Sequence, residues 1–166
     1  MENQKIQVAI DGPASAGKST VAKLVAKKFG YIYCDTGAMY RAVTLKAIQS
    51  QIELTDESAV VAMLKQTQIS FQPGDPVQHV FIDGNEITEA IRQPKITNSV
   101  STIASLGGVR AELVNRQRDI AKQSSIVMDG RDIGTAVLPN APVKIFLIAS
   151  AVSYTHLRAH ETLSDL

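Results

Sequence analysis

Short apolar runs alternate with helical repeats along the first third of the chain. Residues 6–10 form an apolar-rich run, apolar positions recur at helical spacing over residues 19–29, and Gly30 follows as a helix stop. Residues 31–34 predict a second strand, and residues 38–50 a second helix. Because strands and helices alternate, the pattern predicts an α/β fold whose parallel sheet has right-handed crossovers and flanking helices.

The pattern changes in the middle of the chain. Thr55 is expected to cap a further helix, and alternating short strands with turn residues follow it. The predicted strands are residues 69–72, 79–82 and 86–87, with turns at residues 73–76 and 83–84. We therefore predict a small antiparallel β insert, about residues 66–92, outside the parallel sheet.

Helical and strand patterns return in the last third. Helical periodicity covers residues 94–106, breaks at residues 107–108, and continues over residues 109–123. Residues 125–128 and 144–148 are apolar enough to predict two strands that are buried on both faces. Together the elements predict one domain over residues 1–150.

Composition narrows the classes of partner. The chain has 166 residues and a net charge of +1, so binding of nucleic acid through a broad positively charged surface is not expected. Cys34 is the single cysteine, which excludes an intramolecular disulfide and fits a reducing compartment. No apolar run reaches the length of a signal peptide core or a membrane span. We therefore expect a cytoplasmic protein with no membrane partner.

A phosphate-binding motif lies between the first predicted strand and helix. Residues 12–19 (Gly-Pro-Ala-Ser-Ala-Gly-Lys-Ser) match the pattern G-x-x-x-x-G-K-[ST] in the setting that this motif requires. Its backbone N–H groups can surround phosphate oxygens, Lys18 can reach the β- and γ-phosphates, and the Ser19 hydroxyl can hold Mg²⁺. The predicted ATP-binding residues are Gly12, Pro13, Ala14, Ser15, Ala16, Gly17, Lys18, Ser19 and Thr20.

Further polar residues follow other predicted strands. Asp129 ends an apolar strand, where a carboxylate can assist the metal, so Ser19 and Asp129 are the predicted metal ligands. Arg131 and Arg41 offer planar guanidinium groups suited to phosphate. The chain lacks the base-reading Asn-Lys-x-Asp of GTPases and the Ser-Gly-Gly-Gln of transport ATPases. These residues instead indicate a second phosphorylated substrate.

Three segments taken together resemble the bacterial cytidylate kinase family of P-loop nucleoside monophosphate kinases. They are residues 12–19, residues 35–41 (Asp-Thr-Gly-Ala-Met-Tyr-Arg) and residues 129–135 (Asp-Gly-Arg-Asp-Ile-Gly-Thr). The β insert is similar to the enlarged monophosphate-binding region of that family. The resemblance covers residues 4–150.

The resemblance implies transfer of the γ-phosphoryl group of ATP to CMP or dCMP with Mg²⁺, by a monomer. It makes Lys18 and Arg131 catalytic, and it lets Asp132 accept from the cytosine amino group while Arg110 and Ser101 donate. The implied CMP-binding residues are Thr36, Arg41, Ser101, Arg110, Arg131 and Asp132. Two alternatives stay open: an inactive nucleotide-binding fragment, and another small-molecule P-loop kinase.

The last residues do not follow the family pattern. Residues 151–166 resemble translated sequencing-adapter DNA joined to an interrupted gene, so we expect an assembly artefact; a natural variant C-terminus is the alternative. The family's arginine-bearing lid and final strand are absent, so we expect poor turnover and association through an uncovered sheet edge. His156 and His160 lack the adjacent glutamate of a zinc motif, and no metal site is expected there.

Overall fold

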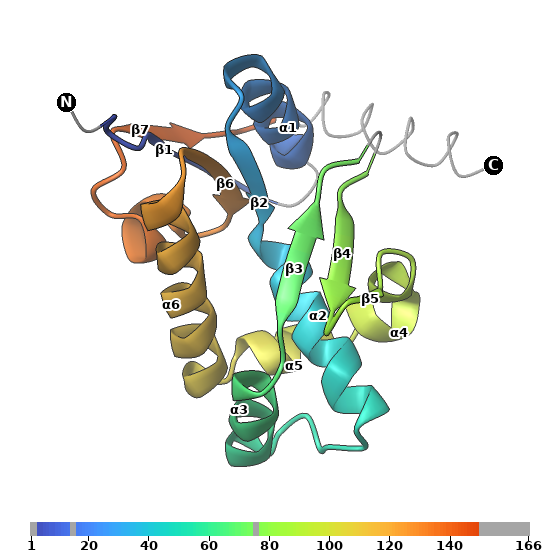
Figure 1. Ribbon diagram of the computed structural model, residues 1–166. Helices are drawn as coiled ribbons and strands as arrows, with labels where there is room; N and C mark the ends of the chain where they lie inside the picture. The colour runs from blue at the N-terminus through green and yellow to red at the C-terminus, as the bar shows by residue number, and fades with distance from the viewer. Residues whose placement is uncertain (1–2, 14–15, 75–76, 150–166) are drawn as a thin grey trace. The chain divides into compact units, whose positions relative to one another are not determined.

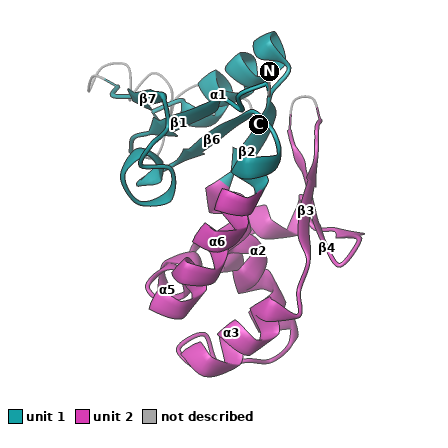
Figure 2. Cartoon of the chain, turned by 60° about the vertical axis from the view of Figure 1, so that its left-hand side comes forward, with its two compact units in different colours: residues 1–35, 120–166 teal, residues 36–119 magenta. Residues whose placement is uncertain are grey.

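The computed structural model describes residues 3–13, 16–74 and 77–149. Ala14, Ser15 and the tail of residues 151–166 therefore lie outside the described residues. The chain divides into two compact units, which Figure 2 colours separately. Unit 1 comprises residues 1–35 and 120–166, and unit 2 comprises residues 36–119. Each unit is described by itself.

Unit 1 contains a four-stranded parallel sheet in the order β2-β6-β1-β7 (Figure 1). Its strands are β1 (Gln7–Asp11), β2 (Ile32–Asp35), β6 (Ile126–Gly130) and β7 (Val143–Phe146). The predicted parallel sheet and α/β fold are confirmed. The order places β6 between β1 and β2, although β6 is far from both in the sequence.

Helix α1 (Lys18–Phe29) packs on this sheet through its small residues. Ala22 and Ala26 are buried against Val8 and Val127 of the central strands. Gly30 follows the helix in the left-handed conformation and donates its N–H to the Ala26 carbonyl. The predicted helix stop is therefore confirmed, because glycine adopts this conformation without a Cβ clash.

One burial prediction is wrong. β6 is buried along Ile126–Asp129, as expected, but β7 is largely exposed, and Phe146 retains 65% of its accessible surface. β7 is an edge strand of the described sheet, so its apolar sequence does not imply cover on both faces.

Unit 2 is built around α2 (Thr36–Gln49), which follows β2 directly in the sequence. Its Ala42 and Leu45 pack in one core with Val80 and Ile82 of an antiparallel sheet. That sheet has the order β3-β4-β5, with strands β3 (Ile69–Gln72), β4 (His79–Ile82) and β5 (Asn85–Glu86). The predicted antiparallel insert is confirmed as a separate sheet.

The helices of unit 2 correct two predictions. Besides α2, they are α3 (Glu57–Lys65), the 3₁₀ turn η1 (Ala90–Arg92), α4 (Pro94–Thr97), α5 (Val100–Ala104) and most of α6 (Gly107–Gln123). The cap of α3 is Asp56 rather than Thr55, because the Asp56 carboxylate accepts from the Ala59 N–H at 3.2 Å. Residues 107–108 begin α6 instead of breaking it, and the preceding helical segment is divided into α4 and α5.

Among the described helices, none combines the length and apolar character needed to cross a membrane.

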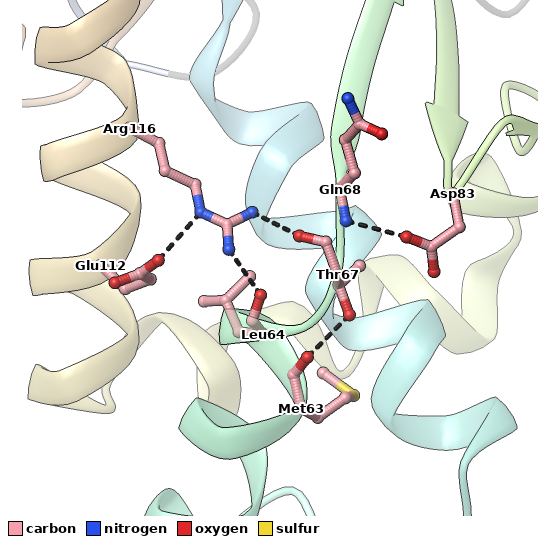
Figure 3. Close-up of polar contacts among 7 residues, drawn as sticks. All are labelled: Met63, Leu64, Thr67, Gln68, Asp83, Glu112 and Arg116. Carbon is pink, nitrogen blue, oxygen red and sulfur yellow. Dashed lines mark hydrogen bonds and ion pairs between the residues drawn. The ribbon is translucent and has the colours of Figure 1, made fainter.

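Arg116 on α6 joins three segments of unit 2 (Figure 3). Its guanidinium donates to the Leu64 carbonyl at 2.5 Å and the Thr67 carbonyl at 2.7 Å, and its Nε donates to Glu112 at 3.0 Å. The Leu64 carbonyl lies in the last turn of α3, where it also accepts the Thr67 N–H at 3.0 Å, and the Thr67 carbonyl lies just before β3. Arg116 therefore supplies a helix cap from a distant part of the chain.

We predict that Arg116→Leu lowers the free energy of unfolding by about 2–4 kcal/mol, because two carbonyls and the Glu112 carboxylate lose a charged donor. Chemical denaturation measures this loss. Arg92→Leu, which removes an exposed arginine, is the matched control and should change stability by less than about 0.5 kcal/mol. Equal losses in the two variants would contradict the capping role.

Candidate functional site

The phosphate-binding motif begins where β1 ends, and its first glycine is required by a close approach. A Cβ on Gly12 would lie 2.3 Å from the Leu147 carbonyl oxygen, and Gly12 has a φ of 147°. The segment after β7 is held there because the Leu147 N–H donates to the Asp11 carbonyl at 2.8 Å. The neighbouring strand thus leaves space for glycine alone at the start of the loop.

The end of the loop leads into α1. Gly17 adopts the left-handed conformation with a φ of 84°, and Lys18 is the first residue of the helix. The N–H groups of a first helical turn have no partners within the helix, so this end attracts anions. The Lys18 ammonium donates to the Pro13 carbonyl at 3.0 Å and therefore reaches back to the start of the loop. Ser19 and Thr20 are exposed in the same turn.

Two carboxylates lie side by side at the adjoining strand ends. Asp35 of β2 and Asp129 of β6 are direct partners in the parallel register. The Tyr33 hydroxyl donates to Asp129 Oδ1 at 3.1 Å. Burial, and then the negative charge of Asp35, raise the pKa of Asp129 to about 7, while Tyr33 and the Lys18 ammonium oppose the shift. Burial and the neighbouring Asp35 therefore disfavour the ionised form of Asp129.

The chemistry of these donors fits a magnesium ion. Carboxylate and hydroxyl oxygens are hard ligands, and Mg²⁺ in kinases uses one or two carboxylates together with substrate phosphates. Asp129 and Ser19 are the predicted ligands, and Asp35 adds a carboxylate that the prediction did not include. Within the described residues no group of three or more His, Cys, Asp or Glu could hold a metal by itself. The set fits a cation whose shell is completed by phosphate.

The predicted CMP-binding residues are divided between the units. In unit 2, Thr36 is buried and Arg41 half-buried on α2, which packs against the α5 helix that carries an exposed Ser101. Arg110 is exposed on α6. In unit 1, Arg131 is exposed and Asp132 half-buried, and both follow β6. Within unit 2, the helices that carry Thr36, Arg41 and Ser101 are thus packed against each other.

Sequence reasoning did not assign roles to Tyr33 and Asp35. Both lie on β2, two residues apart, so their side chains share one face of the strand. That alternation was visible in the sequence, but the neighbour of β2 was not. Because β6 is that neighbour, Tyr33 and Asp35 act on Asp129.

This geometry defines a class of protein. A strand, a glycine-rich loop and a helix that begins with lysine form the phosphate-binding site of P-loop α/β proteins, here in a parallel sheet whose next strands end in carboxylates. The cytidylate kinase family model matches residues 8–165. The chain belongs to the cytidylate kinase family, which confirms the predicted resemblance.

Relatives of high identity agree with the family. The cytidylate kinase of Pediococcus pentosaceus is 65% identical over 98% of this chain and 72% of its own length. The cytidylate kinase of Lactiplantibacillus plantarum is 62% identical over 98% of this chain and 72% of its length. The cytidylate kinase of Limosilactobacillus fermentum is 61% identical over 96% of this chain and 69% of its own length. The family match continues to residue 165, and the expected origin of residues 151–166 stays a prediction.

The buried carboxylate of Asp129 makes the stability of the protein depend on pH. Asp129 has an ordinary pKa of 3.8 when unfolded and about 7 when folded, so the folded protein binds its proton more tightly. Its contribution to stability is therefore lost as pH rises from about 4 to about 7. Asp129→Asn should remove this loss. In metal-free buffer its free energy of unfolding, relative to wild type, should therefore rise by roughly 2–4 kcal/mol between about pH 4 and about pH 7.

Denaturation at several pH values with a chelator measures the difference. Asp35→Asn is the partial control: it removes the second cause of the shift and leaves burial, so part of the slope should remain. A difference between Asp129→Asn and wild type that stays constant from pH 4 to pH 7 would refute the assignment.

Proposed function

We propose that this protein transfers the γ-phosphoryl group of ATP to CMP or dCMP, giving ADP and CDP or dCDP. The observation that supports the proposal is the contact of Lys18 with the Pro13 carbonyl at the start of the loop between β1 and α1, in a chain of the cytidylate kinase family. The names of the relatives supply the acceptor, since each is a cytidylate kinase.

The triphosphate is bound by groups of one short segment. Backbone N–H groups of the loop and of the first turn of α1 neutralise phosphate oxygens, and Lys18 exchanges the Pro13 carbonyl for the β- and γ-phosphates. Ser19 and Asp129 would hold Mg²⁺, with Asp35 beside them; when bound, the ion neutralises the charge of the phosphates. Lys18 gives further charge neutralisation as the phosphoryl group moves.

The acceptor needs little activation. A CMP phosphate oxygen is ionised near neutral pH, so the reaction proceeds without a general base, by alignment and charge neutralisation. Arg41 and Arg131 are assigned to the phosphate because a guanidinium matches it with two parallel hydrogen bonds. Thr36 is assigned to a position near the acceptor, and the proposed readers of cytosine are Ser101, Arg110 and Asp132.

The test measures ADP release from ATP with CMP, dCMP, UMP or AMP as acceptor, beside a separate measurement of ATP binding. Turnover with CMP or dCMP well above that with UMP and AMP supports the proposal. ATP binding without ADP release would indicate an inactive binding fragment. Equal turnover with all four acceptors would indicate a different small-molecule kinase.

Lys18→Ala should lower turnover at least a hundredfold, because it removes charge stabilisation of about 3 kcal/mol from the transition state. The melting temperature should hardly change, since the ammonium makes one exposed hydrogen bond in the free protein. Lys27→Ala, on the exposed last turn of α1, is the control and should retain full activity. A Lys18→Ala enzyme with more than a third of wild-type turnover would overturn the role of Lys18.

Asp132→Asn should narrow the preference for CMP over UMP about ten- to hundredfold. The carboxylate accepts from the cytosine amino group, and an amide can donate to the uracil carbonyl that replaces it. The ratio of kcat/KM values for CMP and UMP measures the change. Asp56→Asn, which alters a carboxylate at the start of α3, should leave the ratio unchanged. An unchanged ratio in Asp132→Asn would instead assign Asp132 a structural role.

A further inference from the structure

Asp11 makes a contact that the proposed phosphate-binding role does not use. It is the last residue of β1, directly before Gly12, and its side chain is buried, with 8% exposure. Its two carboxylate oxygens accept one backbone N–H each, from Ile133 at 2.7 Å and from Gly134 at 2.8 Å. Sequence reasoning gave Asp11 no function.

The two N–H groups belong to the first turn of a short helical segment, η2 (Ile133–Val137), which has π-helical hydrogen bonding. Such N–H groups lack partners within the helix. The residue at the cap position, Asp132, makes no side-chain cap hydrogen bond. Asp11 supplies the missing acceptor from β1, and its charge strengthens both bonds.

This contact fixes the link that carries Arg131 and Asp132. The link begins at Gly130, which pairs with Asp11 in the parallel register of β1 and β6. It ends at Ile133, whose N–H is bound by the Asp11 carboxylate. Asp11 therefore lies opposite the start of the link in the sheet, and its carboxylate binds the end of the link.

The packing around the contact leaves little space for adjustment. A Cβ on Gly134 would lie 3.3 Å from Asp11 Oδ2 and 3.2 Å from Lys144 Cδ. The turn can therefore lie this close to the carboxylate because residue 134 lacks a side chain. A shift of the Asp11 carboxylate would move the turn, and with it the adjoining Asp132.

We propose that Asp11 is a positioning residue for the monophosphate substrate: through the N–H groups of Ile133 and Gly134 it holds Arg131 and Asp132 where they bind phosphate and cytosine. This inference rests on the proposed function. It makes Asp11 a determinant of CMP affinity and base choice, although the residue adjoins the ATP loop in the sequence.

The test compares Asp11→Ala and Asp11→Asn with wild type, all as the full 166-residue chain. KM and kcat are measured for CMP, UMP and ATP, and amide hydrogen exchange is measured at residues 133 and 134. Asp11→Ala should raise the KM for CMP about tenfold or more and narrow the CMP-to-UMP ratio, while the KM for ATP changes less than about threefold. The two amides should exchange at least tenfold faster.

Asp11→Asn keeps one acceptor and the shape of the side chain, so its effects should be intermediate. It also keeps the test decisive if Asp11→Ala does not fold. The matched control is Asp56→Ala, which removes the carboxylate that caps α3 by accepting from the Ala59 N–H. It should lower stability and leave the KM for CMP and the base ratio unchanged.

The outcomes separate the two proposals. A wild-type chain that neither binds nor phosphorylates CMP overturns the proposed function, and the positioning role falls with it. A wild-type chain that phosphorylates CMP, with Asp11 variants that raise the KM values of CMP and ATP equally, overturns the positioning role alone. So do Asp11 variants in which amide exchange accelerates while the KM for CMP and the base ratio stay at wild-type values.

Discussion

The insertion of β6 between β1 and β2 is the constraint on which the chemistry of unit 1 depends. Parallel strands end at the same edge of a sheet, so this order brings Asp11, Asp35 and Asp129 to one edge. The Tyr33 hydroxyl reaches Asp129 because β2 and β6 are neighbours in this order. The strand order thus determines both which carboxylates interact and which group orients them.

The same edge combines close backbone packing with a buried carboxylate whose ionised form is disfavoured. The Leu147 carbonyl excludes any side chain at Gly12, so the loop starts against the neighbouring strand. Burial of Asp129 beside Asp35 is unfavourable in the absence of a cation, as the raised pKa of Asp129 indicates. A cation beside the carboxylates would favour their ionised forms, and a phosphate would attract the Lys18 ammonium. The site therefore fits a metal–nucleotide complex, which brings both charges.

Unit 2 uses different means to hold its segments. Charged side chains cap both ends of α3: Asp56 accepts the Ala59 N–H at its start, and Arg116 donates to the Leu64 and Thr67 carbonyls at its end. Glu57 accepts from the Gly108 N–H at 2.7 Å, which joins the starts of α3 and α6. The contacts of Arg116 and Glu57 thus join α6, which carries Arg110, to α3, and the buried Gln117 of α6 adds a hydrogen bond to Met39 of α2.

The sequence by itself determined the features that depend on neighbouring residues. The alternation of strands and helices, the turn at residues 83–84, the stop at Gly30 and the phosphate-binding motif follow from local periodicity and backbone preference, and each was predictable. The exposure of β7 was not, because an apolar strand looks the same at the centre and at the edge of a sheet. The roles of Tyr33, Asp35 and Asp11 were decided by tertiary structure alone: each acts on residues about a hundred positions away, and only the strand order brings these together.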